Sequence, residues 1–378
     1  MNNKILGIIG GGQLGKMLLQ YTSRLSLKTY VYDPSPEAPC KNLCDKFYTG
    51  GLMDYDKIVE FGQKCDIITY EIEHVNIEAL KYLENKGVIV YPKPSTLEII
   101  QNKNTQKCFF KNNDLPTSNF NLYNNVSDIK NDIEKGQIKL PFVWKKTTFG
   151  YDGFGVKIIK SLTDLNEIEN GECIIEDYVN IKKEISVIVA RNSNKQYKSY
   201  DPVEMIFNEE SNQVEYVMQP VNLSNNILNE VMDLAYDLSY KIDHIGIMAI
   251  EMFITKEGKI LINELAPRPH NSGHLTIENC CQTSQFEQHI RCILNLSLGE
   301  TEFTMPSIMC NIVGNQGYSG KVLYKGLENI FNSENTYLHI YGKKETRPNR
   351  KMGHFTIVGS NSLLHRAKAL KDSIKVIV

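Results

Sequence analysis

The sequence lacks the features that mark several large classes of protein. Its 378 residues carry a net charge of only -2, and its longest apolar stretches have the length of strands. Without an excess of positive charge, the chain has no general attraction for nucleic acid. Without a membrane-length apolar run or a signal peptide, it is expected to be cytoplasmic and to have no membrane partner. An anionic ligand must therefore be bound at a local site.

The cysteines also lack an organised pattern. The nine thiols are odd in number and scattered, and no two of them have the C-x-x-C spacing of zinc or thioredoxin-like motifs. Buried, reduced thiols are the expected state of such cysteines. What the sequence does contain is an ordinary globular composition, with 42% apolar residues, and a length that suits two or three domains.

The N-terminal part alternates between strand and helix patterns. Strands are expected at 4–9, 29–32, 67–70 and 88–91, and helices at 55–63 and 77–85. This alternation predicts an α/β unit with a parallel sheet. Four strands are too few for a full six-stranded dinucleotide-binding sheet. Pro92-Lys93-Pro94 ends the unit, and Ser95 is the expected N-cap of the next helix.

A glycine-rich turn follows the first strand. Gly10 to Gly15 fits G-x-G-x-x-G, and Asp33 lies near the spacing of an acid that binds an adenosine ribose. Three interpretations remain open for this weak motif. It can bind a nicotinamide dinucleotide, it can hold one phosphate of a mononucleotide at a helix N-terminus, or it can serve only the close packing of helix and strand.

Two apolar runs around Glu257-Gly258 predict a β-hairpin that carries a pair of acids. A two-residue loop there places Glu251 directly opposite Glu264, with their Cβ atoms roughly 5 Å apart on one face. Like charges so close require a cation, and oxygen ligands with room for phosphates suit Mg²⁺ better than zinc. The alternative is a pair of solvated glutamates on an edge hairpin, which the flanking apolar residues disfavour.

Two further segments are rich in hydrogen-bond donors and cations. In the loop 265–274, Arg268 can bind a carboxylate, bicarbonate or phosphate, and His270 can donate a hydrogen bond or move a proton. Six basic side chains lie within 341–354: Lys343, Lys344, Arg347, Arg350, Lys351 and His354. A solvated basic loop or an RNA contact is possible there, but scarce aromatic residues favour a single phosphate ester. For Arg268 and His270, ordinary surface or capping roles are the alternative.

Several longer motifs occur along the chain: GGGQLG (10–15), TYEIEH (69–74), GYDG (150–153), NELAPRPHNSGH (263–274), SQFEQH (284–289) and RKMGH (350–354). Together they resemble the 5-(carboxyamino)imidazole ribonucleotide synthetases, ATP-grasp enzymes of purine biosynthesis. The succession of NELAPRPHNSGH and SQFEQH is highly specific. It separates this family from biotin carboxylases and from the formate-using glycinamide ribonucleotide transformylase. The resemblance spans nearly the whole chain.

The resemblance implies a fold and a reaction. The expected fold is a three-domain α/β ATP-grasp architecture: an N-terminal Rossmann-like domain (1–95), an ATP-grasp domain (96–298) with a mobile lid at about 116–178, and a small β-rich C-terminal domain (299–378). The implied reaction joins bicarbonate to 5-aminoimidazole ribonucleotide through carboxyphosphate, with ATP as substrate and Mg²⁺ as cofactor. Such phosphoryl transfer depends mainly on positioning and charge neutralisation. A homodimer is also implied.

The resemblance also assigns roles to individual residues. ATP contacts are implied for Lys103, Lys145, Glu176, Asp177, Val179, Glu184 and Asn263, and Mg²⁺ contacts for Glu251 and Glu264. Catalytic positions are Tyr151, Asp152, Arg268 and His270, while Gln13, Glu73, Asn271, Ser272, Lys343, Arg350 and Lys351 belong to the substrate region.

The flap at 146–155 departs from the family pattern. Phe149 replaces a glycine, Phe154 replaces a cation, and Thr147 stands where Arg is frequent. These changes can reduce activity or alter flap closure. They leave three alternatives to the assigned reaction: an ATP-grasp ligase acting on another small amine, a nucleotide-binding module without catalysis, and, more distantly, a nicotinamide-dependent oxidoreductase.

Overall fold

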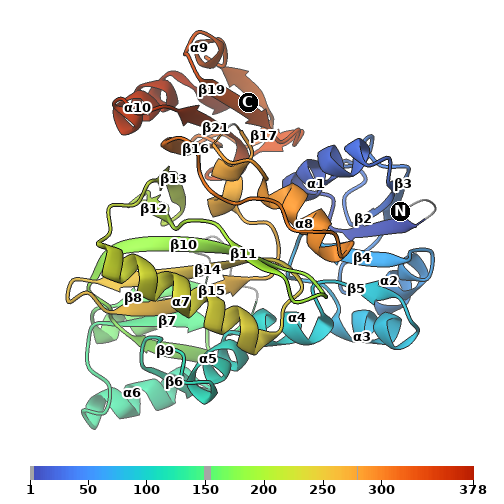
Figure 1. Cartoon of the computed structure of the whole chain (residues 1–378). Helices are drawn as coiled ribbons and strands as arrows, with labels where there is room; N and C mark the ends of the chain where they lie inside the picture. Colours follow the sequence, from blue (N-terminus) through green and yellow to red (C-terminus); the bar gives the residue numbers. More distant parts are fainter. Residues whose placement is uncertain (1–3, 149–154, 279) are drawn as a thin grey trace.

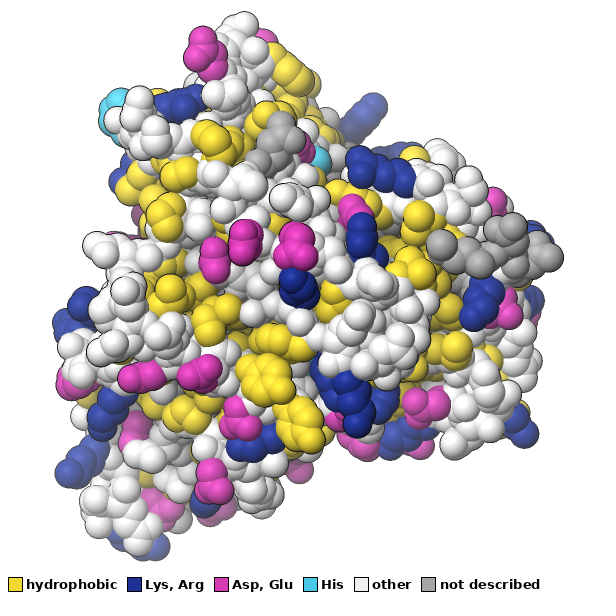
Figure 2. All heavy atoms as spheres, in the orientation of Figure 1, with side chains coloured by type: hydrophobic (Ala, Val, Ile, Leu, Met, Phe, Trp, Pro, Cys, Tyr) yellow, Lys and Arg dark blue, Asp and Glu magenta, His cyan; other side chains and the backbone are white. Residues whose placement is uncertain are grey.

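The computed structural model describes residues 4–148, 155–278 and 280–378, and Figure 1 shows their arrangement. The N-terminal sheet lies to one side of a larger body, over which the C-terminal strands are stacked. Within these ranges, no helix has both the length and the apolar character needed to cross a membrane. On the face drawn in Figure 2, Lys and Arg side chains are interspersed with Asp and Glu.

The N-terminal unit is a parallel sheet of five strands in the order β3-β2-β1-β4-β5. The strands are β1 (Ile5–Ile9), β2 (Lys28–Asp33), β3 (Lys46–Thr49), β4 (Ile67–Tyr70) and β5 (Ile89–Val90), and the helices are α1 (Gln13–Arg24), α2 (Tyr55–Gly62) and α3 (Ile77–Asn85). The parallel sheet confirms the α/β prediction.

Two details of the N-terminal prediction were wrong. The expected four strands omitted β3, an edge strand of four residues that none of the described helices separates from β2, so the strand-helix alternation gave no signal for it. Ser95 is not an N-cap, because helix α4 (Pro94–Gln101) already begins at Pro94. The fixed φ of proline suits the first turn of a helix, where its missing N–H costs nothing.

A second, four-stranded antiparallel sheet has the order β6-β9-β7-β8. Its elements are β6 (Phe120–Tyr123), α6 (Val126–Glu134), β7 (Phe142–Lys146), β8 (Val156–Ile159), the 3-10 turn η1 (Leu162–Glu167) and β9 (Cys173–Asp177). Helix α5 (Lys103–Asn112) leads into it. The Lys103 N–H donates to the carbonyl of Thr147 over 2.8 Å, which fixes the start of α5 against the end of β7.

The largest sheet is antiparallel and joins the middle of the chain to its C-terminal part. Its order is β15-β14-β10-β12-β13-β16-β21-β19, with β11 paired to β10. The strands are β10 (Ile181–Arg191), β11 (Tyr197–Ser199), β12 (Val203–Phe207), β13 (Val214–Gln219), β14 (Gly246–Thr255), β15 (Ile260–Ala266), β16 (Ser307–Val313), β19 (Thr336–Ile340) and β21 (Lys351–Val358). Because β16 pairs with β13, the C-terminal part continues the sheet that carries the hairpin.

The remaining elements cover the large sheet or close its C-terminal end. They are α7 (Asn225–Ile242), the 3-10 turn η2 (Asn271–Thr276), α8 (Gln285–Ile293), β17 (Gly320–Lys321), β18 (Leu323–Lys325), α9 (Glu328–Phe331), β20 (Glu345–Thr346), α10 (Leu363–Ser373) and β22 (Lys375–Ile377). Strand β17 pairs with β20, and β18 with β22.

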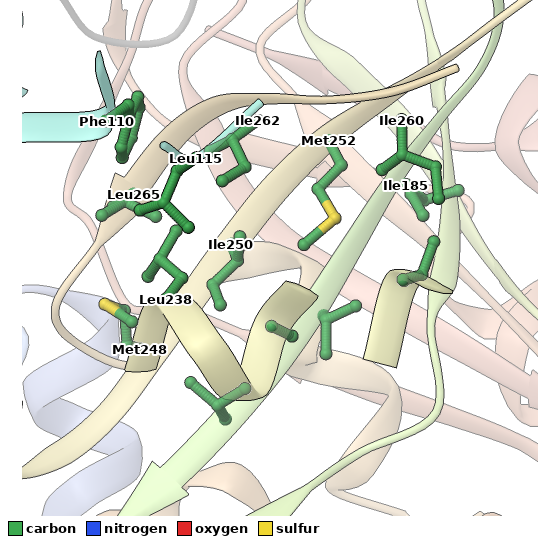
Figure 3. Packing of buried hydrophobic residues seen from close by; sticks show 14 of the residues in the cluster. Phe110, Leu115, Ile185, Leu238, Met248, Ile250, Met252, Ile260, Ile262 and Leu265 are labelled. Atoms are coloured by element: carbon green, nitrogen blue, oxygen red, sulfur yellow. The ribbon is translucent and has the colours of Figure 1, made fainter. Parts of the chain in front are cut away.

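One face of β14 is apolar and packs on α7, and the other face carries the acidic Glu251. Met248, Ile250 and Met252 point toward α7, where they pack with Leu238 in the main apolar cluster (Figure 3). Glu251 lies between them in sequence and therefore points to the opposite face. Burial of one face thus fixes the strand and presents the other face to the cavity described below.

The β14–β15 hairpin confirms that Glu251 pairs with Glu264, but by a different route from the predicted one. Ile254 pairs with Ile260, one position away from the register that a two-residue loop gives, and the Thr255 N–H donates to the carbonyl of Lys259. A bulge at Asn263 then restores the predicted register. Bulges often redirect a side chain beside an active site.

The packing of β14 on α7 gives a stability prediction. Ile250 is fully buried. We expect Ile250→Ala to lower the free energy of unfolding by about 2 to 5 kcal/mol, because the lost side chain leaves a cavity. Ile158→Ala, at a site that is 43% exposed, should cost less than about 1 kcal/mol. Equal shifts of the two denaturation midpoints would contradict the assignment of Ile250 to the core.

Candidate active site

A cavity of about 210 Å³ lies on the polar face of the β14–β15 hairpin. It brings together residues that lie far apart in sequence: Glu73, Lys103, Glu251, Glu264, Arg268, His270, Asn271 and Lys351. Thr147, at the point where the flap begins, also lines it. Tyr151, Asp152, Phe149 and Phe154 lie outside the described residues.

The glutamate pair places two carboxyl groups side by side in the cavity. The Glu251 side chain is 14% exposed, and its Oε1 lies 3.5 Å from His270 Nε2. Burial and the neighbouring Glu264 carboxylate raise the pKa of Glu251 to about 8. The Lys103 ammonium pairs with Glu264 and lowers the pKa of that carboxyl to about 2. One lysine thus compensates one of two adjacent carboxylates, and a divalent cation would supply the positive charge that allows Glu251 to ionise as well.

The loop after β15 is held by its own polar contacts. Arg268 lies 2.9 Å from Glu73, at the end of the N-terminal sheet, and its buried Nε has no hydrogen-bond partner among the described residues. The Ser272 hydroxyl is 2.9 Å from His270 Nδ1 and 2.8 Å from the Ser186 hydroxyl, which fixes the imidazole beside the glutamate pair. A guanidinium with a free donor can bind an oxyanion.

Asn271 occupies the same loop. Its side-chain amide exchanges two hydrogen bonds of 2.8 Å with that of Asn311 on β16. The loop is therefore tied to the C-terminal part of the large sheet.

A buried charge cluster lies next to this cavity, between α5, β7 and β9. Glu176 is 3.0 Å from Lys145 and 3.2 Å from Lys107, and it accepts a hydrogen bond of 2.6 Å from Ser118. Although burial opposes it, the two ammonium groups lower the pKa of Glu176 to about 2. Lys145 also donates to Asn263 over 2.9 Å, so it links Glu176 to the bulge beside Glu264.

The other residues assigned to nucleotide binding lie beyond Glu176 along the chain. Asp177 is exposed and accepts a hydrogen bond of 2.8 Å from Asn119, and Val179 is half-buried. Burial raises the pKa of Glu184 to about 7. Glu184 and Ser186 lie two residues apart on β10, so their side chains point to the same face of the sheet. Ser186 pairs with Glu251 on β14, which places all three side chains on that face.

Three of the six C-terminal basic side chains, those of Lys343, Lys344 and Arg350, line a second cavity of about 450 Å³, together with Gly12 and Asp33. The Lys343 ammonium donates to the carbonyl of Lys351 over 2.8 Å, which connects this cavity to the first. Gln13 is in neither lining as the structure describes them, although Gly12 next to it is in the second.

The glycine-rich turn holds a carboxylate of its own chain. Glu71 accepts hydrogen bonds from the N–H groups of Gly12 over 2.7 Å, Leu14 over 3.1 Å and Gly15 over 3.2 Å. A Cβ on Gly10, which has a φ of +96°, would lie 2.6 Å from Glu71 Cγ. These donors are the ones that would hold a phosphate at a helix N-terminus. Of the three interpretations, the packing role is therefore favoured.

Two charged residues that these contacts depend on, Lys107 and Glu71, were missed in the sequence analysis. Lys107 lies four residues after Lys103 on α5, and this spacing puts both side chains on one helix face, so it was a usable signal. Glu71 had no comparable signal, because its contact with the glycine turn depends on the pairing of β4 with β1.

Comparisons with known proteins agree with this arrangement. Three family models match the chain: the ribonucleotide synthetase preATP-grasp domain over residues 3–101, the ATP-grasp domain over 108–286, and the phosphoribosylaminoimidazole carboxylase C-terminal domain over 307–368. The N5-carboxyaminoimidazole ribonucleotide synthase of Bacillus subtilis is 35% identical over 94% of this chain and 91% of its own.

Solved structures are similar over nearly the whole length. The N5-carboxyaminoimidazole ribonucleotide synthetase of Thermotoga maritima has 41% identity and a TM-score of 0.89, and the match covers 99% of each chain. The synthase of Aspergillus clavatus, in complex with ADP and 5-aminoimidazole ribonucleotide, has 29% identity and a TM-score of 0.87 over 98% of this chain and 96% of that one.

The fold and the cavity define an ATP-grasp enzyme, an ATP-dependent carboxylating ligase. With its preATP-grasp and carboxylase C-terminal parts, the chain belongs to the N5-carboxyaminoimidazole ribonucleotide synthase family. The three-domain α/β architecture expected from the resemblance is confirmed.

The occupied glycine turn gives a binding prediction. We expect neither NAD nor NADP to bind in calorimetry, because Glu71 already takes the donors that a pyrophosphate needs. ADP, titrated into the same sample, serves as the positive control. Saturable binding of either dinucleotide at micromolar concentration would contradict the packing role of the turn.

Proposed function

We propose that this chain carboxylates 5-aminoimidazole ribonucleotide with bicarbonate, at the expense of ATP, to give N5-carboxyaminoimidazole ribonucleotide, ADP and phosphate. The observation that carries the proposal is the single cavity in which the Glu251–Glu264 pair meets the Arg268 loop. A site for phosphoryl transfer and a site for a small oxyanion thus adjoin. The Aspergillus clavatus relative holds ADP and the same ribonucleotide, which supports the choice of acceptor.

The proposed chemistry has two steps. A bicarbonate oxygen attacks the γ-phosphate of ATP, and the bond to the β-phosphate oxygen breaks, so carboxyphosphate and ADP form. The exocyclic amine then attacks the carboxyphosphate carbon, inorganic phosphate leaves, and the amine proton is lost. Phosphoryl transfer of this kind requires positioning and charge neutralisation. Lys103 and Lys145 supply positive charge, while Arg268 would hold bicarbonate and His270 would accept or donate a proton.

Mg²⁺ fits the acidic part of this cavity. Glu251 and Glu264 would hold it, and it would neutralise phosphate charge when bound. Asn263, on the bulge beside Glu264, would contact ATP. The described residues contain no group of three or more His, Cys, Asp or Glu side chains placed to bind a metal. The remaining ligands would therefore be phosphate oxygens and water, which is the usual manner of Mg²⁺ binding.

We assign the acceptor to the region between the two cavities. Lys343, Arg350 and Lys351 would bind its phosphate, since Lys343 and Arg350 line the second cavity and Lys351 lines the first. Glu73, Asn271, Ser272 and Gln13 would complete the ribonucleotide site, with Tyr151 and Asp152 from the flap. Glu176, Asp177, Val179 and Glu184 would contact the adenosine part of ATP.

The proposal also includes the wider organisation of the protein. We infer domains at 1–95, 96–298 (lid at about 116–178) and 299–378, a homodimer, and a cytoplasmic location. The near-neutral charge and the specific family motifs support a small-molecule enzyme over a nucleic-acid or membrane partner.

Acceptor-dependent ADP release is the direct test of the function. With Mg²⁺ and ATP, we expect ADP release to rise at least about tenfold when bicarbonate and 5-aminoimidazole ribonucleotide are both added. Bicarbonate accepts the phosphoryl group, and the acceptor then consumes the carboxyphosphate. Omission of either substrate is the control, and mass spectrometry identifies the product. Turnover with a different amine would indicate another acceptor. Binding of ATP without turnover would indicate a non-catalytic module.

Substitution at Glu264 tests the metal site. We expect Glu264→Gln to reduce Mg²⁺-dependent turnover by about a hundredfold or more, because it removes a charge at constant shape. Glu257→Gln makes the same substitution on the exposed loop of the same hairpin and should leave the rate unchanged. Thermal unfolding shows whether both variants fold. Near-normal turnover in folded Glu264→Gln would reject the metal assignment.

A further inference from the structure

Lys107 is a buried lysine that the proposed chemistry does not use. Its side chain is 3% exposed, and its ammonium donates to the hydroxyls of Thr117 over 2.5 Å and Ser118 over 2.9 Å. Glu176 lies on its other side, at 3.2 Å. Neither Lys107 nor Lys145 is in the described lining of the cavity, but Lys145 also contacts Asn263, beside Glu264, which lines it. Lys107 contacts Thr117, Ser118 and Glu176, so it lies behind the site and acts through Glu176.

The cluster around Lys107 has more positive than negative charge. Two ammonium groups, of Lys107 and Lys145, flank the single carboxylate of Glu176, and the exposed fractions of the three side chains are 3%, 9% and 4%. A buried charge without a partner is costly, so the excess positive charge favours an anion nearby. ATP phosphates are such an anion in the proposed reaction.

Lys145 is the one of the two lysines that can reach that anion. It contacts Asn263 as well as Glu176, so its ammonium lies between the buried cluster and the glutamate pair. If Glu176 depended on Lys145 alone, a move of Lys145 toward phosphate would leave a buried carboxylate unpaired. Removal of one partner from a buried ion pair costs several kcal/mol. Lys107 removes this cost, because it keeps Glu176 compensated throughout.

We propose that Lys107 is a positioning residue: it holds Glu176 in place as its permanent counter-ion and so frees Lys145 to bind the phosphates of ATP. The inference rests on the proposed function, in which ATP occupies this site. The other charged groups that face Lys107 are Glu176 on β9, Lys145 on β7 and Lys103 on α5. Thr117 and Ser118 add neutral hydrogen-bond partners and no charge.

Nucleotide affinity tests the proposal without any requirement for acceptor or bicarbonate. We expect Lys107→Met to raise the Kd for ADP at least about tenfold, because Lys145 then remains with Glu176. The KM for 5-aminoimidazole ribonucleotide should change less than about twofold. Lys111→Met, on the exposed side of the same helix, is the matched control and should bind ADP normally.

A double-mutant cycle separates positioning from a purely structural role. In Glu176→Gln, position 176 is neutral and no longer retains Lys145. Lys107→Met should therefore add little to the loss of ADP affinity that Glu176→Gln causes. Additive losses would overturn the proposal, as would unchanged ADP affinity in folded Lys107→Met. Absence of ADP binding by the wild type would instead overturn the proposed function, and this inference with it.

The pH dependence gives a readout that does not require the Met variant to fold. Burial lowers the pKa of Lys107 to about 8, so its charge is present below that pH and is lost above it. We expect the ADP affinity of the wild type to fall above about pH 8, while Lys107→Arg, which stays charged, retains its affinity to higher pH. The same decline in both proteins would contradict the role of Lys107.

Discussion

Two carboxylates held side by side on one face of a β-hairpin impose the constraint on which the rest of the site depends. Glu251 and Glu264 cannot both ionise at this distance without nearby positive charge. Lys103 compensates Glu264, and burial together with this neighbour raises the pKa of Glu251. The start of α5, the order of the strands and the bulge at Asn263 are all needed to keep this pair and its lysine together.

The same principle extends into the buried cluster behind the cavity. Three acids and three lysines lie between the hairpin and α5: Glu251, Glu264, Lys103, Lys145, Glu176 and Lys107. Lys103 pairs with Glu264, whereas Lys145 and Lys107 both pair with Glu176. In the proposed reaction, ATP and Mg²⁺ would add one anion and one cation to this set. Lysines that pair with carboxylates in the structure could then bind phosphate, and Glu251 and Glu264 would hold the metal. Such exchange of partners avoids an isolated buried charge.

Much of the site could be predicted from the sequence because it lies on local patterns. The two apolar runs around Glu257-Gly258 predicted a hairpin with Glu251 opposite Glu264, and the structure agrees. Two errors in the prediction cancelled. The loop differs from the assumed two-residue loop and shifts the register by one position, and the bulge at Asn263, which was not predicted, shifts it back. Strand β3 and the contact of Glu71 with the glycine turn are tertiary features, and no local pattern marks them.

The glycine turn shows how a familiar motif takes a different role in this fold. Its N–H groups hold Glu71, just after β4 ends, and Glu73, two residues later, contacts Arg268 across the cavity. Burial raises the pKa of Glu71, so its backbone donors must compensate the cost of its charge. A loop that elsewhere binds pyrophosphate therefore anchors the end of β4 here. Because the anchor and Glu73 belong to one short segment, the glycine turn helps to position an acid at the substrate cavity.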